Sequence, residues 1–263
     1  MSHIYKEQTV GIVVLSYNEE RLIDKTLAGM PDYVDKIYVV DDGSTDKSAG
    51  IVKELQNKDK RIVLSRHMVN KGPGAALVTG YKMALQDDLD IIAKMDGDNQ
   101  MDPEQLPRLL DLIVNGVADY SKGNRLSKNK HKKGMSRWRR FGNFILSILT
   151  KISSGYWHVQ DPQNGYTAIS KNALKRINLD KVYAYYGYCN DLLTKLNVMG
   201  MRVSEVGMPA RYGSEVSAIR YGAYIRKVSF LLLRNFIWRI NHRLITIFAN
   251  GKVEDKTATK YHV

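Results

Sequence analysis

The first half of the chain alternates candidate strands with segments of helical spacing. The candidate strands, most of them apolar and rich in β-branched residues, are 9–16, 35–42, 61–67, 89–96 and 118–125. The helical segments between them are 19–30, 44–58, 72–86 and 102–114. Continuous apolar runs are typical of strands covered on both faces, and parallel strands need long crossovers. This order therefore predicts an α/β fold: a mostly parallel, Rossmann-like sheet with helices on both faces.

Composition limits the partners and cofactors. Hydrophobic residues make up 44% of the 263 residues, enough for a sizeable core. The single cysteine, Cys189, excludes an internal disulfide framework and a zinc site with several cysteines. No window reaches eighteen uncharged apolar residues and the N-terminus is polar, so we expect no transmembrane helix, no secretory signal and a cytoplasmic location. The net charge of +13 predicts an acidic partner: nucleic acid, anionic lipid or a phosphorylated substrate.

Polar, carboxylate-rich motifs follow the first, second and fourth strands, at residues 16–20, 41–46 and 95–102. In parallel sheets ligands bind at the carboxyl ends of the strands. One acidic strand end is also typical of a helix N-cap. All of them together predict a site for a metal ion and a polyhydroxylated or base-containing ligand. Ser44 or Thr45 is expected to begin the second helix, with Asp46 in its first turn.

Asp96 and Asp98 are the candidate metal ligands. Carboxylate oxygens suit hard cations such as Mg²⁺ or Mn²⁺, and a cation held by few carboxylates keeps positions that substrate phosphates fill. Gly97 between them lets the backbone pass closely. A calcium loop is disfavoured, because Pro107 stands where such a loop has its twelfth-position glutamate.

The motifs VVLSYNEE, VVDDGSTD, NKGPGAAL and KMDGDNQMDP resemble, in order and spacing, those of the family 2 inverting glycosyltransferases with the GT-A fold. The resemblance runs from about residue 10 to about residue 220. Within the family, the segments 121–125, 161–170 and 205–217 are most similar to polyprenol-phosphate sugar transferases of the dolichol-phosphate mannose synthase type. The resemblance implies a UDP- or GDP-sugar donor, a Mg²⁺ or Mn²⁺ cofactor and a lipid-linked acceptor of the kind used in cell-envelope polysaccharide synthesis.

The resemblance also implies residue roles. The positions that match nucleotide-sugar contacts are Tyr17, Glu19, Asp42, Lys71, Gly72, Asp96 and Arg211. Asp96 and Asp98 match the metal-binding DxD pair. The positions that match the acceptor site are Arg125, Arg139 or Arg140, Gln163 and Asn164. This chain departs from the family pattern at Leu15, where proline is usual, and at Gln163 and Asn164, where lipid-phosphate enzymes often have a small serine.

The implied chemistry is a direct displacement at the anomeric carbon. A sugar hydroxyl acceptor would need a general base, and Asp191 stands where the family usually has one, with Asp161 as a second catalytic candidate. A lipid phosphate is already ionised near neutral pH and needs little help from a base. The structural alternatives are an aspartate in the first turn of a helix for Asp191 and a turn before Pro162 for Asp161.

The second half of the chain carries uneven positive charge. Residues 125–140 hold eight Lys or Arg and no acid, and segments 125–152 and 221–248 combine apolar stretches, basic residues and tryptophan. Such segments suit amphipathic helices on an anionic membrane surface. The alternative is a C-terminal helix that packs on its own domain or on a second subunit of a homo-oligomer. We therefore predict a GT-A domain over 1–220, a helical extension over 221–250 and a disordered tail over 251–263.

Other functions fit less well. A nucleic-acid-binding protein would explain the basic charge but not the acidic strand ends, and no helix-turn-helix, RNP or zinc signature is found. A sugar nucleotidyltransferase usually has a glycine-rich loop after its first strand, where this chain has SYNEERL. A glycosyltransferase with a soluble or polysaccharide hydroxyl acceptor stays open as the alternative to the lipid-linked acceptor.

Overall fold

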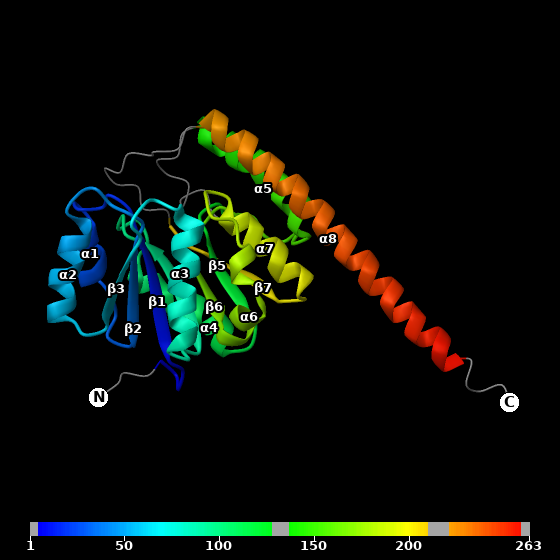
Figure 1. Ribbon diagram of the computed structural model, residues 1–263, viewed down its shortest axis with the longest axis horizontal. Helices are drawn as coiled ribbons and strands as arrows, with labels where there is room; N and C mark the ends of the chain where they lie inside the picture. Colours follow the sequence, from blue (N-terminus) through cyan, green and yellow to red (C-terminus); the bar gives the residue numbers. More distant parts are fainter. Residues whose placement is uncertain (1–4, 128–136, 210–220, 259–263) are drawn as a thin grey trace.

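Among the residues described, seven strands form one sheet at the centre of the molecule (Figure 1). The strands are β1 (Val10–Ser16), β2 (Lys36–Asp41), β3 (Ile62–Arg66), β4 (Ile91–Asp96), β5 (Tyr120–Asn124), β6 (Thr167–Ser170) and β7 (Val203–Gly207). Their order is β3-β2-β1-β4-β6-β5-β7. The computed structural model describes residues 5–127, 137–209 and 221–258, without the side chains of 137–141, 143, 221–225 and 246–258.

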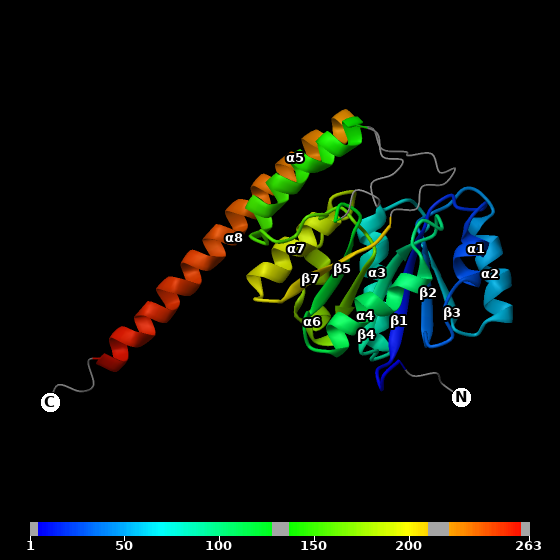
Figure 2. The same ribbon diagram turned by 180° about the vertical axis from the view of Figure 1, so that it is seen from behind.

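Helices cover both faces of the sheet (Figures 1 and 2). They are α1 (Ile23–Ala28), α2 (Ser48–Lys58), α3 (Pro73–Gln86), α4 (Leu106–Val114), α5 (Arg137–Ser154), α6 (Lys171–Arg176), α7 (Tyr188–Val198) and α8 (Tyr221–Ala258). In β1, Ile12 and Val14 pack with α1, α2 and α4, whereas Val13 and Leu15 pack with α3, α6 and α7. Successive side chains of a strand point to opposite faces, so a strand buried on both sides must be apolar throughout.

The predicted α/β fold with a mostly parallel sheet is confirmed, with one reversal. Strands β1, β2, β3 and β4 are mutually parallel, and β5 is parallel to β7. Strand β6 lies between β4 and β5 and runs antiparallel to both. Its four residues, TAIS, carry too little periodicity to reveal a strand or its direction.

Helices α2 and α4 each begin four residues later than the sequence predicts. Helix α2 begins at Ser48 and not at Ser44 or Thr45, because Ser44 and Asp46 instead bind the loop that follows β1. Asn18 N donates to Ser44 Oγ at 2.9 Å and Glu20 N donates to Asp46 Oδ2 at 3.1 Å. Pro107 lies in the first turn of α4, the place where a helix tolerates proline.

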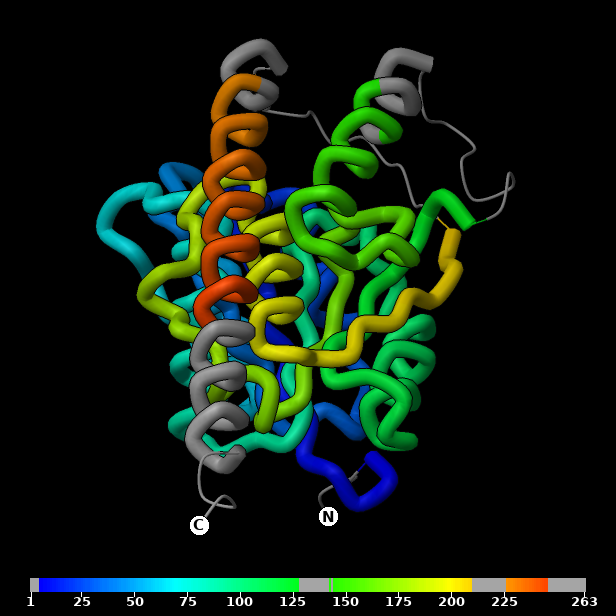
Figure 3. Tube along the Cα trace, turned by 90° about the vertical axis from the view of Figure 1, so that its right-hand side faces the viewer, coloured from blue at the N-terminus to red at the C-terminus, as the bar shows by residue number. Residues whose placement is uncertain are grey.

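Helices α5 and α8 pack side by side and against α7 (Figure 3). Arg239 of α8 is buried, and its guanidinium donates to the carbonyls of Ser153 at 2.8 Å and Ile152 at 2.9 Å. It thus satisfies carbonyl groups at the C-terminus of α5, where a cation is favourable. Whereas the sequence predicts a disordered tail from residue 251, α8 continues to Ala258. The boundary predicted at residue 220 lies outside the described residues.

None of the helices in the described part of the chain has the length and apolar character needed to cross a membrane.

Gly80 brings α3 into direct contact with β1 and provides a test of the packing. A Cβ atom at Gly80 would lie 2.3 Å from Val13 Cγ1, so Gly80→Ala should lower the free energy of unfolding by about 1–2 kcal/mol, despite the better helix propensity of alanine. Gly50 of α2 is the matched control: nothing lies within 4 Å of its Cβ position, and Gly50→Ala should stabilise the protein by up to about 1 kcal/mol. Urea denaturation of both variants checks this, and equal effects would contradict the close packing.

Candidate active site

The register of the parallel strands places the acidic motifs at one edge of the sheet. Leu15 pairs with Asp96, and Ser16 pairs with Asp41. Backbone hydrogen bonds continue beyond the strands: Asp42 N donates to Ser16 O at 2.9 Å, and Gly97 N donates to Leu15 O at 2.8 Å. The predicted convergence of the polar strand ends is therefore confirmed.

Asp96 and Asp98 follow β4 at this edge. The Asp96 side chain is 37% exposed, and its Oδ1 lies 2.5 Å from Lys94 Nζ. Asp98 is half-buried, and its Oδ1 accepts a hydrogen bond from Gln100 N at 3.0 Å. Asp102, the third acid of the motif, accepts from Glu104 N and caps the short 3₁₀ turn Pro103–Gln105. The two remaining carboxylates provide the oxygen donors that Mg²⁺ and Mn²⁺ prefer.

Among the described residues no group of three or more His, Cys, Asp or Glu side chains is placed to hold a metal ion. The Asp96 and Asp98 pair fits a cation that takes its other ligands from water and from substrate phosphates, as Mg²⁺ commonly does.

Asp42 organises the loop between β3 and α3. It is buried, and it binds His67 Nδ1 at 2.7 Å, Lys71 N at 2.9 Å and Gly72 N at 2.8 Å. Gly72 has φ +95°, which only glycine adopts easily. Asp42 therefore holds in place the loop that was predicted to lie near the nucleotide. Its own contact with a nucleotide stays a prediction.

The remaining predicted nucleotide residues that are described lie in the loops at this edge, Tyr17 and Glu19 after β1 and Lys71 beside Asp42. Tyr17 is 45% exposed, Glu19 is half-buried and Lys71 is exposed. Tyr186, which the sequence analysis missed, also faces this group: partial burial raises its pKa, and so do the negative charges of Asp96, Glu19 and Asp42. The run VYAYYGY is the only signal that could have indicated it.

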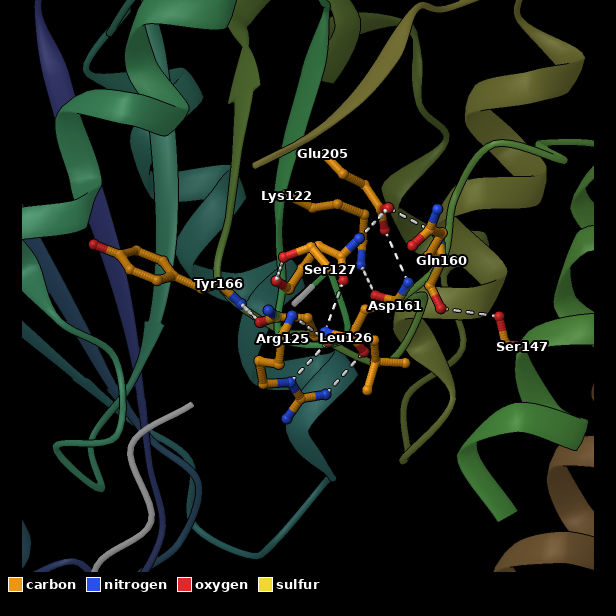
Figure 4. Close-up of polar contacts among 11 residues, drawn as sticks. Lys122, Arg125, Leu126, Ser127, Ser147, Gln160, Asp161, Tyr166 and Glu205 are labelled. Atoms are coloured by element: carbon orange, nitrogen blue, oxygen red, sulfur yellow. Dashed lines mark hydrogen bonds and ion pairs between the residues drawn. The ribbon is translucent and has the colours of Figure 1, made fainter. Parts of the chain in front are cut away.

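Arg125 and Asp161 form a partly buried ion pair at the end of β5 (Figure 4). Asp161 is 1% exposed; its Oδ2 accepts from Arg125 Nε at 2.8 Å and its Oδ1 accepts from Nη2 at 3.0 Å. Burial alone would raise the pKa of Asp161, but the charge and hydrogen bonds of Arg125 bring it below its usual value. Asp161 is thus held as an anion that orients Arg125. This arrangement does not favour a proton-accepting role for Asp161.

Glu205 and Lys122 support this pair from β7 and β5 (Figure 4). Glu205 accepts from Gln160 N at 2.8 Å, from Asp161 N at 2.9 Å and from Asn124 Nδ2 at 2.9 Å. Lys122, fully buried, donates to the carbonyl of Asp161. Burial lowers the pKa of Lys122, and the nearby carboxylates of Asp161 and Glu205 oppose that shift. The turn that carries Asp161 is therefore fixed at several points.

Gln163 and Asn164 lie in the loop between this turn and β6. Three of their side-chain atoms are buried and have no hydrogen-bond partner within the described part of the chain: Nε2 and Oε1 of Gln163 and Nδ2 of Asn164. Buried polar atoms without partners carry an energetic penalty of about 1–3 kcal/mol each, so they point to a bound ligand or water. This is consistent with the predicted acceptor role, which stays a prediction.

Asp191 lies in the first turn of α7 and is fully buried. Its carboxylate accepts from Lys195 Nζ at 2.6 Å, from Tyr183 N at 2.9 Å and from Asn235 Nδ2 of α8 at 3.0 Å. These contacts favour the structural alternative, an aspartate in the first turn of a helix, which here pairs with Lys195 of the same helix and accepts a hydrogen bond from α8, over a base that meets a substrate. Its catalytic role stays a prediction.

The remaining predicted site residues can be placed only in part. Arg139 and Arg140 lie in the first turn of α5, where side chains are not described, and Arg211 lies outside the described residues.

The family is decided by comparison with known proteins. The family model described as Glycosyl transferase family 2 matches residues 11–177, more than half of the chain. The chain belongs to glycosyl transferase family 2. This match runs from the second residue of β1 to beyond β6 and so includes both aspartates of the DxD pair. The glycosyltransferase is therefore an enzyme of the class that the sequence motifs predicted.

Relatives of this glycosyltransferase are named for lipid-phosphate acceptors. It is 30% identical over 219 residues to the UDP-N-acetylglucosamine–dolichyl-phosphate N-acetylglucosaminyltransferase of Methanococcus voltae, covering 78% of this chain and 87% of that one. It is 27% identical over 248 residues to the polyprenol monophosphomannose synthase of Mycolicibacterium smegmatis, covering 90% and 89%. The similarity to polyprenol-phosphate sugar transferases is thus confirmed.

Solved structures confirm the GT-A-like fold. The glucosyl-3-phosphoglycerate synthase of Mycobacterium tuberculosis, in complex with Mn²⁺ and UDP-glucose, superposes with a TM-score of 0.68 at 21% identity, over 88% of this chain and 79% of that one.

Asp191→Asn tests which role this residue has. Removal of one partner from a buried ion pair typically lowers the free energy of unfolding by about 3 kcal/mol, and we expect that loss in urea denaturation. Asp180→Asn is the control, because Asp180 pairs with Lys82 on the surface and the change should be below about 0.5 kcal/mol. Unchanged stability of Asp191→Asn, together with a loss of about 100-fold in transfer to a hydroxyl acceptor, would instead support the general base.

Proposed function

We propose that this glycosyltransferase transfers a sugar, with inversion, from a UDP- or GDP-sugar to a lipid-linked acceptor at a membrane surface, with Mg²⁺ or Mn²⁺ as cofactor. The observation that carries the donor half is the position of Asp96 and Asp98 at the same strand edge as Tyr17, Glu19 and Asp42. The names of the relatives, which include dolichyl-phosphate and polyprenol, support the acceptor half.

In the proposed reaction, Asp96 and Asp98 hold the cation, which would neutralise the diphosphate leaving group. Tyr17 and Glu19 bind the nucleotide, and Asp42 fixes the loop of Lys71 and Gly72 beside it. A lipid phosphate is ionised before it binds, so no residue has to take its proton. That agrees with the contacts of Asp161 and Asp191, whose carboxylates form ion pairs with Arg125 and Lys195.

Arg125 is the proposed contact for the acceptor phosphate. A guanidinium presents several donors in a fixed geometry and binds phosphate well when it is oriented. Asp161 provides that orientation, because it engages both Nε and Nη2 of Arg125. The buried amides of Gln163 and Asn164 lie two and three residues after Asp161 in the chain and are proposed to bind the acceptor.

Helices α5 and α8 carry the proposed membrane surface. Their exposed large apolar residues are Phe144, Ile145, Ile148, Leu149, Ile152, Phe230, Leu233, Ile237, Trp238, Leu244 and Ile245. Arg226, Lys227, Arg234 and Arg243 are exposed on α8 among them. Apolar side chains that insert shallowly, next to cations that bind anionic headgroups, suit a helix lying in the interface. This arrangement supports a lipid-linked acceptor over a soluble one. It also favours a membrane over a second subunit as the partner of this surface.

Asp98→Asn tests the donor site. An amide is a poorer ligand for a hard cation than a carboxylate, so this variant should keep its melting temperature but lose at least about tenfold in Mn²⁺-dependent affinity for UDP or GDP. Isothermal titration calorimetry with and without Mn²⁺ measures this. Asp102→Asn is the control, because Asp102 caps the 3₁₀ turn, and its nucleotide affinity should stay near the wild-type value. Wild-type affinity in Asp98→Asn would contradict the metal site.

Phe230→Glu tests the membrane surface. Phe230 is 70% exposed on α8, and a charge there should reduce co-sedimentation of the full chain with anionic phosphatidylglycerol vesicles several-fold. Val117→Glu adds the same charge at an apolar residue that is 52% exposed outside α5 and α8, so it should bind like the wild type. High salt should release part of the bound wild-type protein. No binding of wild type at low salt, or equal binding of both variants, would refute the proposed surface.

A further inference from the structure

Lys94 is a buried charged residue beneath the proposed metal site. It lies in β4, two residues before Asp96, and only 1% of its side chain is exposed. A buried ammonium group is unfavourable unless it is paired, and the contact from Nζ to Asp96 Oδ1, at 2.5 Å, provides the pairing. In the middle of the apolar strand IIAKMD, this ammonium group therefore depends on Asp96 as its ion-pair partner.

The surroundings keep space for this ammonium group. A Cβ atom at Gly165 would lie 2.6 Å from Lys94 Nζ and 3.4 Å from Asp96 Oδ2, so the glycine leaves room for both. Nζ also lies 5.9 Å from the centre of the Tyr188 ring, within the range of a cation–π contact. The ammonium group thus lies where β4, α7 and the loop before β6 come together.

We propose that Lys94 is a positioning residue that occupies Oδ1 of Asp96 and weakens divalent-cation binding when no nucleotide is present, so that the cation binds together with the diphosphate of the donor. This inference rests on the proposed function. The ammonium group neutralises part of the Asp96 charge and repels a divalent cation at the same carboxylate, and burial leaves that repulsion poorly screened. The negative charge of a diphosphate offsets it.

This arrangement has a consequence for the catalytic cycle. Once the sugar has left, the nucleoside diphosphate and a cation held by Asp96 would depend on each other for tight binding, so loss of one would favour loss of the other. Lys94 would thus promote joint release and keep the empty site free of metal. The 37% exposure of Asp96 matters for the test, because water can solvate the carboxylate when Lys94 is replaced.

The test is Mn²⁺ binding, measured from the electron paramagnetic resonance signal of free Mn²⁺, with and without UDP or GDP. In the wild type, the nucleotide should tighten Mn²⁺ binding strongly. In Lys94→Met, the affinity without nucleotide should rise at least about tenfold, so that the effect of the nucleotide shrinks. The matched control is Lys122→Met, which removes an equally buried lysine from β5; Lys122 donates to the carbonyl of Asp161, and its loss should leave Mn²⁺ affinity unchanged.

The outcomes separate this inference from the proposed function. A folded Lys94→Met protein whose nucleotide-free Mn²⁺ affinity is unchanged or weaker would overturn the role of Lys94. If that variant fails to fold, Gly165→Ala decides instead: its methyl group displaces the ammonium and should strengthen nucleotide-free Mn²⁺ binding in the same direction, and no change would overturn the inference. If wild type binds Mn²⁺ no better with UDP or GDP than without, the proposed donor site itself fails.

Discussion

The parallel pairing of β1 with β2 and β4 is the constraint on which the site depends. It fixes Leu15 opposite Asp96 and Ser16 opposite Asp41, so that acidic residues far apart in the sequence end at one edge. Both faces of these strands are packed against helices, and a shift of register by one residue would turn every core side chain to the wrong face. The apolar core thereby fixes the register that brings these carboxylates to one edge of the sheet.

Three ion pairs, each with at least one buried partner, lie at this edge and in the elements around it. Lys94 binds Asp96, Arg125 binds Asp161, and Lys195 binds Asp191. Each pair has a different role in the structure. The first lies at the proposed metal site, the second orients an arginine toward the proposed acceptor, and the third connects α7 to α8 through Asn235. Because α8 also carries the proposed membrane surface, the third pair ties that surface to the catalytic domain.

The sequence predicts the parallel core and the acidic edge well, because both depend on local patterns. Apolar runs identify β1, β2 and β4, and each polar motif directly follows its strand. The sequence does not reveal which partner a charged side chain takes, since partners come from distant segments: Asp161 pairs with Arg125, and Arg239 binds carbonyls of α5. For the same reason the sequence does not show that Asp191, which the resemblance implies as a base, contacts Lys195 and Asn235 in the fold. Strand β6 is missed because four residues are too few to show a period.

The most direct measurement of the central claim is transfer of radiolabelled sugar from a panel of UDP- and GDP-sugars to a polyprenyl phosphate in vesicles, in the presence of Mn²⁺. The account predicts that one donor gives a labelled product that partitions into organic solvent, that chelation of the cation prevents its formation, and that its anomeric configuration is opposite to that of the donor. Label that appears only on soluble or polysaccharide hydroxyl acceptors, with none in the organic phase for any donor, would contradict it.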